Sequence, residues 1–84
     1  MDPKQYAGAV EALVKQLRPV LAGHPPEVQS GAIADCLATF LAGHVVRGDP
    51  KGTKKLRERI LSAVIVAVHK LIEPNAKEIG TWQE

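Results

Sequence analysis

The segment from Leu56 to Ile72 carries more apolar surface than a chain of 84 residues can easily hide. Read as a helix, its apolar side chains cover an arc of about 200°, roughly twice the stripe that a helix normally turns toward a core. No alternation with a period of two residues supports a strand, and the charged flanks at 54–59 and 69–73 are typical of a helix. The apolar set comprises Leu56, Ile60, Leu61, Ala63, Val64, Ile65, Ala67, Val68, Leu71 and Ile72.

Prolines and glycines divide the chain into three predicted helices, at residues 3–21, 26–46 and 50–73, followed by a short tail at 74–84. Short connections between helices favour antiparallel neighbours. The sequence therefore predicts an all-α fold, namely a three-helix up-down-up bundle formed by a single domain over residues 1–84.

Local signals set the expected ends of these helices. Asp2 precedes Pro3 and suits an N-terminal cap, with Gln5 in the position of its capping-box partner. Pro19 is expected to end or kink the first helix, with Gly23 as its C-terminal cap. Further prolines and glycines mark the later boundaries. We favour Asp49 over Thr53 as the cap of the third helix, expect that helix to stop before Pro74, and expect Gly80 to close any turn in the tail.

A scaffold of this size is marginal, because apolar burial and the loss of conformational entropy nearly cancel. Cys36 is the only cysteine, so a disulfide cannot contribute. We therefore expect a homodimer to complete the fold and to cover the exposed side of the third helix. The predicted dimer interface is Leu61, Ile65, Val68 and Ile72.

Two further features are candidates for docking a larger protein. A stripe of small residues runs along the second helix, where another backbone can approach closely; it consists of Gly31, Ala34, Ala38 and Ala42. Trp82 is the only large hydrophobic side chain in the tail that could contact a partner. It could equally well fold back and cover one end of the bundle.

The charge distribution supports a second interpretation. The net charge is only +2, but residues 47–59 hold six basic and two acidic side chains, which sum to +4. Such a stretch can neutralise phosphates, which makes nucleic acid or another anion the alternative partner. The residues expected to make that contact are Arg47, Lys51, Lys54 and Lys55. No aromatic side chains interleave these charges for base stacking, and the glycine spacing does not match a phosphate-binding P-loop.

Residues with catalytic or metal-binding chemistry do not form a recognisable site. His44 shares the apolar stripe of the second helix, but a histidine near a helix C-terminus is common and favourable there. Cys36 lies among apolar neighbours, so we expect it to be a small buried hydrophobic residue and not a nucleophile. His24 and His69 are not separated from His44 or Cys36 by the short intervals, such as four residues along a helix, that are typical of metal ligands. We predict no enzymatic activity, no metal and no cofactor.

The expected location is the cytoplasm, because the single thiol suits a reducing compartment. The longest apolar run, residues 60–68, is far shorter than the roughly 20 residues that a membrane span needs. No motif in the chain is specific enough to indicate a family.

Overall fold

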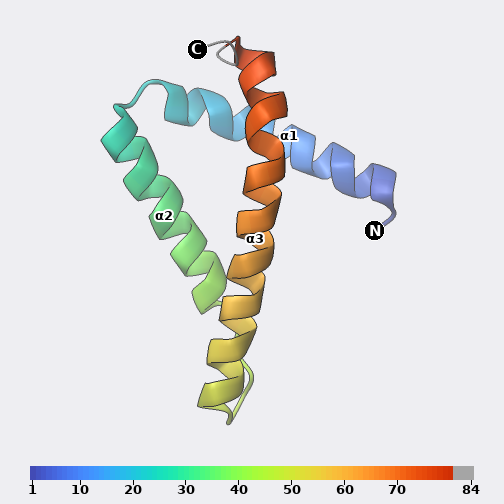
Figure 1. Cartoon of the computed structure of the whole chain (residues 1–84), viewed down its shortest axis with the longest axis vertical. Coiled ribbons are helices and arrows are strands. Elements are labelled where there is room, and N and C mark those ends of the chain that lie inside the picture. The colour runs from blue at the N-terminus through green and yellow to red at the C-terminus, as the bar shows by residue number, and fades with distance from the viewer. Residues whose placement is uncertain (81–84) are drawn as a thin grey trace. The chain divides into compact units, whose positions relative to one another are not determined.

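A computed structural model of the chain describes residues 1–80 and contains three helices (Figure 1). They are α1 (Pro3–Ala22), α2 (Pro26–Ala42) and α3 (Pro50–Ile79). No strand occurs within the described range, so the predicted all-α fold is confirmed. The chain divides into two compact units, Met1–Cys36 and Leu37–Glu84, which are described separately. The up-down-up order and the single-domain organisation stay predictions.

The first unit begins with the capping box that the sequence predicts. The Gln5 backbone N–H donates to Asp2 Oδ1 at 2.8 Å, and the Asp2 N–H donates in return to Gln5 Oε1 at 3.1 Å. These bonds satisfy donors that the first helical turn leaves free. Pro19 lies inside α1 and does not end the helix, which continues to Ala22, one residue beyond the predicted end, and is capped by Gly23 as expected.

A side chain of α2 closes the end of α1 within the same unit. Gln29 Nε2 donates to the carbonyl oxygens of Leu21 and His24, both at 2.8 Å. The last carbonyls of a helix have no partner within the helix. The two amide hydrogens of Gln29 therefore satisfy groups that the turn at residues 23–25 leaves unpaired.

In the second unit α2 ends at Ala42, four residues before the predicted boundary at residue 46. Gly43 still donates to Thr39 O at 3.1 Å, but the His44 N–H bonds to Leu41 O in a tighter turn. Beyond that turn, the backbone of residues 44–46 bonds to side chains of α3 instead of continuing the helix. The prediction failed because these competing bonds come from residues far along the sequence.

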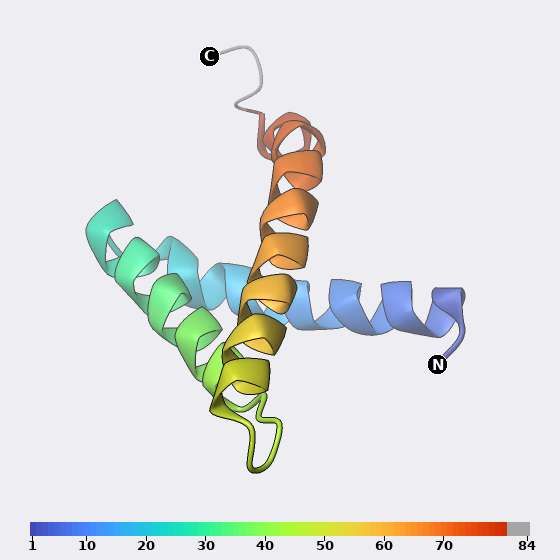
Figure 2. The ribbon, with the colours of Figure 1, turned by 60° about the horizontal axis from the view of Figure 1, so that its bottom comes forward.

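The C-terminal end of α3 lies beyond the predicted one (Figure 2). The helix was expected to end at residue 73, but it continues to Ile79 and has 30 residues. Pro74 lies inside the helix, so the predicted tail at 74–84 is wrong as far as Ile79. Good helix-forming residues follow the proline, and the ion pair between Glu73 and Lys77, at 3.6 Å, spans it. Gly80 ends the helix with φ of 84°, a left-handed conformation that glycine adopts without strain.

Candidate functional site

The connection between α2 and α3 fixes the start of α3 within the second unit (Figure 2). Asp49 caps α3, as favoured from the sequence, and its Oδ1 accepts from the Gly52 N–H at 2.8 Å. Thr53, the rejected cap, has a different role. Its hydroxyl accepts from the Val46 N–H at 2.9 Å and donates to Val46 O at 3.2 Å.

Arg57 extends this network by one further turn of α3. Its Nη2 donates to Ala42 O at 2.9 Å, and its Nε donates to His44 O at 3.1 Å. A cation at a helix C-terminus is favourable, because the free carbonyls carry partial negative charge. Arg57 is therefore a structural residue, a role that its place in the basic stretch at residues 47–59 does not reveal.

One face of the first half of α3 is turned toward the rest of this unit. The half-buried residues recur at helical spacing and are Thr53, Leu56, Arg57, Ile60, Leu61 and Val64. Leu37 and Leu41 on α2 are half-buried as well. This face accounts for only part of the apolar arc of α3.

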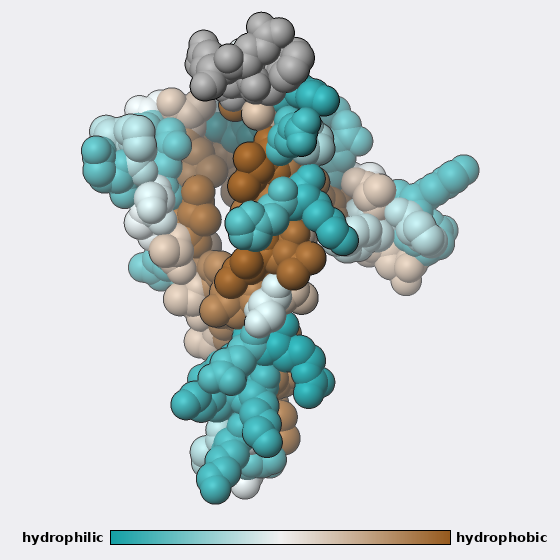
Figure 3. Space-filling model, viewed as in Figure 1, coloured by the Kyte–Doolittle hydropathy of each residue, from teal (hydrophilic) through white to brown (hydrophobic). Residues whose placement is uncertain are grey.

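The other apolar face of α3 is exposed, and it contains the predicted interface. Ile65, Val68 and Ile72 are 48%, 50% and 58% exposed, while Leu61 at the edge of the packed face is half-buried. Not one residue in the described part of the chain is fully buried. Figure 3 shows hydrophobic side chains gathered along the middle of α3, beyond a hydrophilic lower part formed by its first turns.

The exposed stripe is longer than the sequence analysis expected. Because α3 continues through Pro74, Asn75 and Ile79 follow Ile72 at spacings of three and four residues, on the same face. Ile79 is 65% exposed. The spacing itself is present in the sequence, but a helix that stops before Pro74 leaves Asn75 and Ile79 outside the stripe.

The predicted anion-contact residues are all exposed, but they are not all on one surface. Lys51 and Lys55 lie one turn apart on α3, and Arg59 continues the same face by another turn. Lys54 lies to one side of this row, and Arg47 belongs to the connection before the helix. These cations make no ion pair or hydrogen bond within residues 1–80, in contrast to Arg57.

His44 has the surroundings of a structural residue, whereas Cys36 does not. His44 Nδ1 lies 2.8 Å from Phe40 O, and its ring meets the Phe40 ring edge-on with centroids 4.7 Å apart. Cys36 is an exposed free thiol, so the expectation that it is a buried hydrophobic residue is wrong. Within the range that the structure describes, no three His, Cys, Asp or Glu side chains gather as ligands for a metal ion.

The remaining candidates for a partner contact are placed only in part. The small residues of α2, Gly31, Ala34, Ala38 and Ala42, are all exposed. Trp82 lies outside the described residues. No helix among residues 1–80 is both long enough and apolar enough to cross a bilayer.

Comparison with known proteins adds no further constraint on the site. No family model matches the chain, and no match is found among curated proteins or solved structures.

Proposed function

We propose that this chain is a non-enzymatic interaction module that forms a homodimer through the exposed stripe of α3. The observation that supports it most is the exposure of Ile65, Val68 and Ile72 along one side of a helix whose first turns are bonded to the preceding connection. A contiguous apolar patch of this kind is typical of a protein interface.

The energetics favour a partner on this stripe. Removing a large aliphatic side chain from water contributes about 1.5–3 kcal/mol. The stripe offers several such side chains, and a second copy offers an identical set. A symmetric contact between two copies covers both stripes at once.

A charge placed in the stripe tests the proposal. Ile65→Lys is expected to convert a dimer into a monomer, because the ammonium group would have to lose its hydration at the contact. Val66→Lys is the matched control: Val66 is 53% exposed and lies next to Ile65 in sequence, but on another face of α3. Both variants should keep the helical circular dichroism spectrum. If Val66→Lys dissociates the dimer as fully as Ile65→Lys does, another face of α3 forms the contact.

Nucleic-acid binding is a second candidate, and the uncommitted row of Lys51, Lys55 and Arg59 supports it. A row of cations along a helix can follow a phosphate backbone, and its affinity should fall steeply with salt. An electrophoretic shift of mixed-sequence DNA or RNA at low salt, lost in Lys51→Ala/Lys55→Ala, would support this function. No shift at low salt would exclude it.

A further inference from the structure

The exposed stripe of α3 follows the spacing of a coiled-coil seam. Successive members are separated by four, three, four, three and four residues; they are Leu61, Ile65, Val68, Ile72, Asn75 and Ile79. This average of 3.5 residues keeps one line of side chains turned toward a neighbouring helix along its whole length. In the notation of such seams, the three isoleucines occupy the a positions and the other three residues occupy the d positions.

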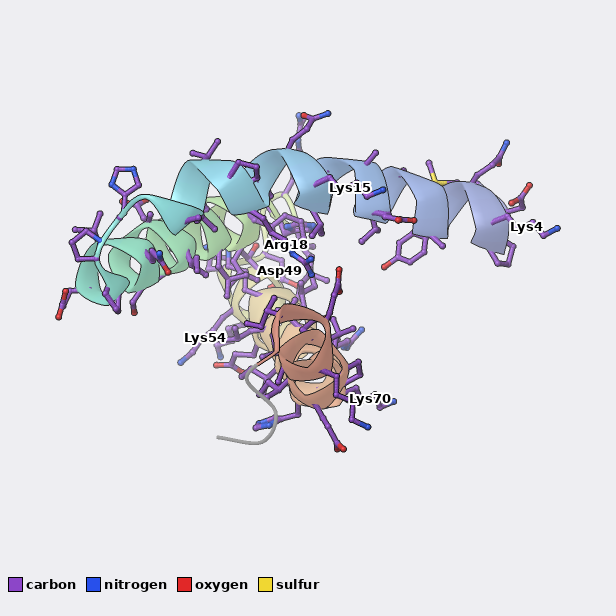
Figure 4. All side chains as sticks on the ribbon, turned by 90° about the horizontal axis from the view of Figure 1, so that it is seen from above. Lys4, Lys15, Arg18, Asp49, Lys54 and Lys70 are labelled. Carbon is purple, nitrogen blue, oxygen red and sulfur yellow. The ribbon has the colours of Figure 1, made fainter. Side chains whose placement is uncertain are left out.

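The same spacing continues toward the start of α3, where the seam becomes charged. Counting back from Leu61 by three, four and three residues reaches Glu58, Lys54 and Lys51. Lys54 and Lys70 extend from opposite sides of α3 (Figure 4). Lys70 follows Leu61 by nine residues, about two and a half turns, and therefore lies on the side of the helix away from the seam. The charged positions therefore continue the apolar line on the same side of the helix.

These charges decide how two copies can pair. In a parallel pair in register, every seam residue faces its own copy, so Lys51, Lys54 and Glu58 would each oppose an identical charge. Like charges placed directly opposite each other at an interface are strongly unfavourable. A pair of α3 helices that run in opposite directions has no such contact.

We infer that two copies of α3 pair in antiparallel fashion, an inference that rests on the proposed homodimer. A two-fold axis between Ile65 and Val68 places Leu61 opposite the partner's Ile72, and Ile65 opposite the partner's Val68. The four residues predicted as the interface then form four layers, each of which joins an a position to a d position.

Two of the three charged seam positions, Glu58 and Lys54, face described residues in this register. Glu58 lies opposite the partner's Asn75, whose amide can donate to the carboxylate. Lys54 lies beside the partner's Ile79, where its long stem covers apolar surface while the ammonium group stays in water. Shifting the axis by one heptad step would instead press the Asn75 amide against the partner's Ile65 and leave it unpaired, which is unfavourable.

Disulfide cross-linking of the full chain tests the orientation. Glu58→Cys and Asn75→Cys are made separately, both in a Cys36→Ser background, and are mixed by unfolding and refolding before mild oxidation. The antiparallel pair predicts a covalent dimer that joins the two different variants, which mass spectrometry distinguishes from either homodimer. Each variant oxidised alone should stay largely uncross-linked, because its two thiols lie about 25 Å apart across the pair.

The other outcomes separate this inference from the proposed function. Efficient cross-linking of Glu58→Cys with itself and of Asn75→Cys with itself would show a parallel pair, and self cross-linking of only one of them would show another antiparallel register. Either result would overturn the inference, while the homodimer would stand. A dimeric mass by light scattering without any mixed cross-link would overturn the register in the same way. A monomeric mass for the Cys36→Ser chain would overturn the homodimer and the inference together. Adding Ile65→Lys to both cysteine variants controls for cross-links that form by random collision.

Discussion

Arg57 donates from Nη2 to the carbonyl oxygen of Ala42, 2.9 Å away, and so joins α3 to the last residue of α2. Its Nε bond to His44 O anchors the next part of the turn. Two carbonyls near a helix end thereby gain a charged donor, which is stronger than a neutral one. This bond network holds the start of α3 in place, while the stripe farther along the helix stays exposed.

Arg57→Ala should lower the free energy of unfolding by about 1–3 kcal/mol, because two charge-assisted bonds are lost at a half-buried site. Chemical denaturation followed by circular dichroism measures the change. Arg59→Ala removes the same charge from an exposed side chain that makes no ion pair or hydrogen bond within residues 1–80, and should change stability by less than about 0.5 kcal/mol. Equal losses in the two variants would show that net charge matters and the bonds do not.

Gln29→Glu should destabilise the first unit by about 1–2 kcal/mol. The change removes both amide hydrogens and turns a carboxylate toward the carbonyl oxygens of Leu21 and His24. Gln16→Glu introduces the same charge on the exposed surface of α1 and serves as the control. Thermal unfolding of the two variants compares them, and a Gln29→Glu variant as stable as Gln16→Glu would contradict the described cap.

Alanine should have opposite effects at two helical glycines. At Gly8 an added Cβ meets no atom within 4 Å, so Gly8→Ala should stabilise the chain by about 0.5–1 kcal/mol. At Gly52 the added Cβ would lie 2.8 Å from Asp49 Cγ and would displace the capping carboxylate. Loss of that cap, about 1 kcal/mol, should cancel or exceed the gain in helix propensity. Similar stabilisation by both substitutions in denaturation experiments would exclude the Asp49 cap.

Pro74→Ala should raise the free energy of unfolding by about 1–3 kcal/mol, because a proline inside a helix removes one backbone bond and crowds the preceding turn. Pro50→Ala is the control, since the first position of a helix accommodates proline without loss. Helix content from circular dichroism should also rise in Pro74→Ala. If the two substitutions have the same small effect, α3 ends before Pro74.

Local sequence signals predicted the helix starts well. The capping residues Asp2 and Asp49 each bond to a backbone N–H three residues later, so the whole signal lies within one turn. The ends at Ala42 and Ile79 were missed for two different reasons. The first depends on Arg57, fifteen residues away, which no local pattern reveals. At the second, the general tendency of helices to stop before proline was outweighed by the residues that follow Pro74.

The candidate surface was predicted in part for the same reasons. Periodicity alone identified Ile65, Val68 and Ile72, and all three are exposed; the partner expected to cover them stays a prediction. It did not identify Ile79, because that residue belongs to the stripe only when the helix continues past Pro74. Nor did it separate Arg57 from the other cations, since composition does not show which charges bond to the backbone.

The molar mass of the full chain in solution tests the central claim most directly. Multi-angle light scattering at micromolar concentration should give twice the 9.0 kDa mass of one chain, falling toward 9.0 kDa for Ile65→Lys. A single species of 9.0 kDa across that concentration range would contradict the homodimer and the interface assigned to α3.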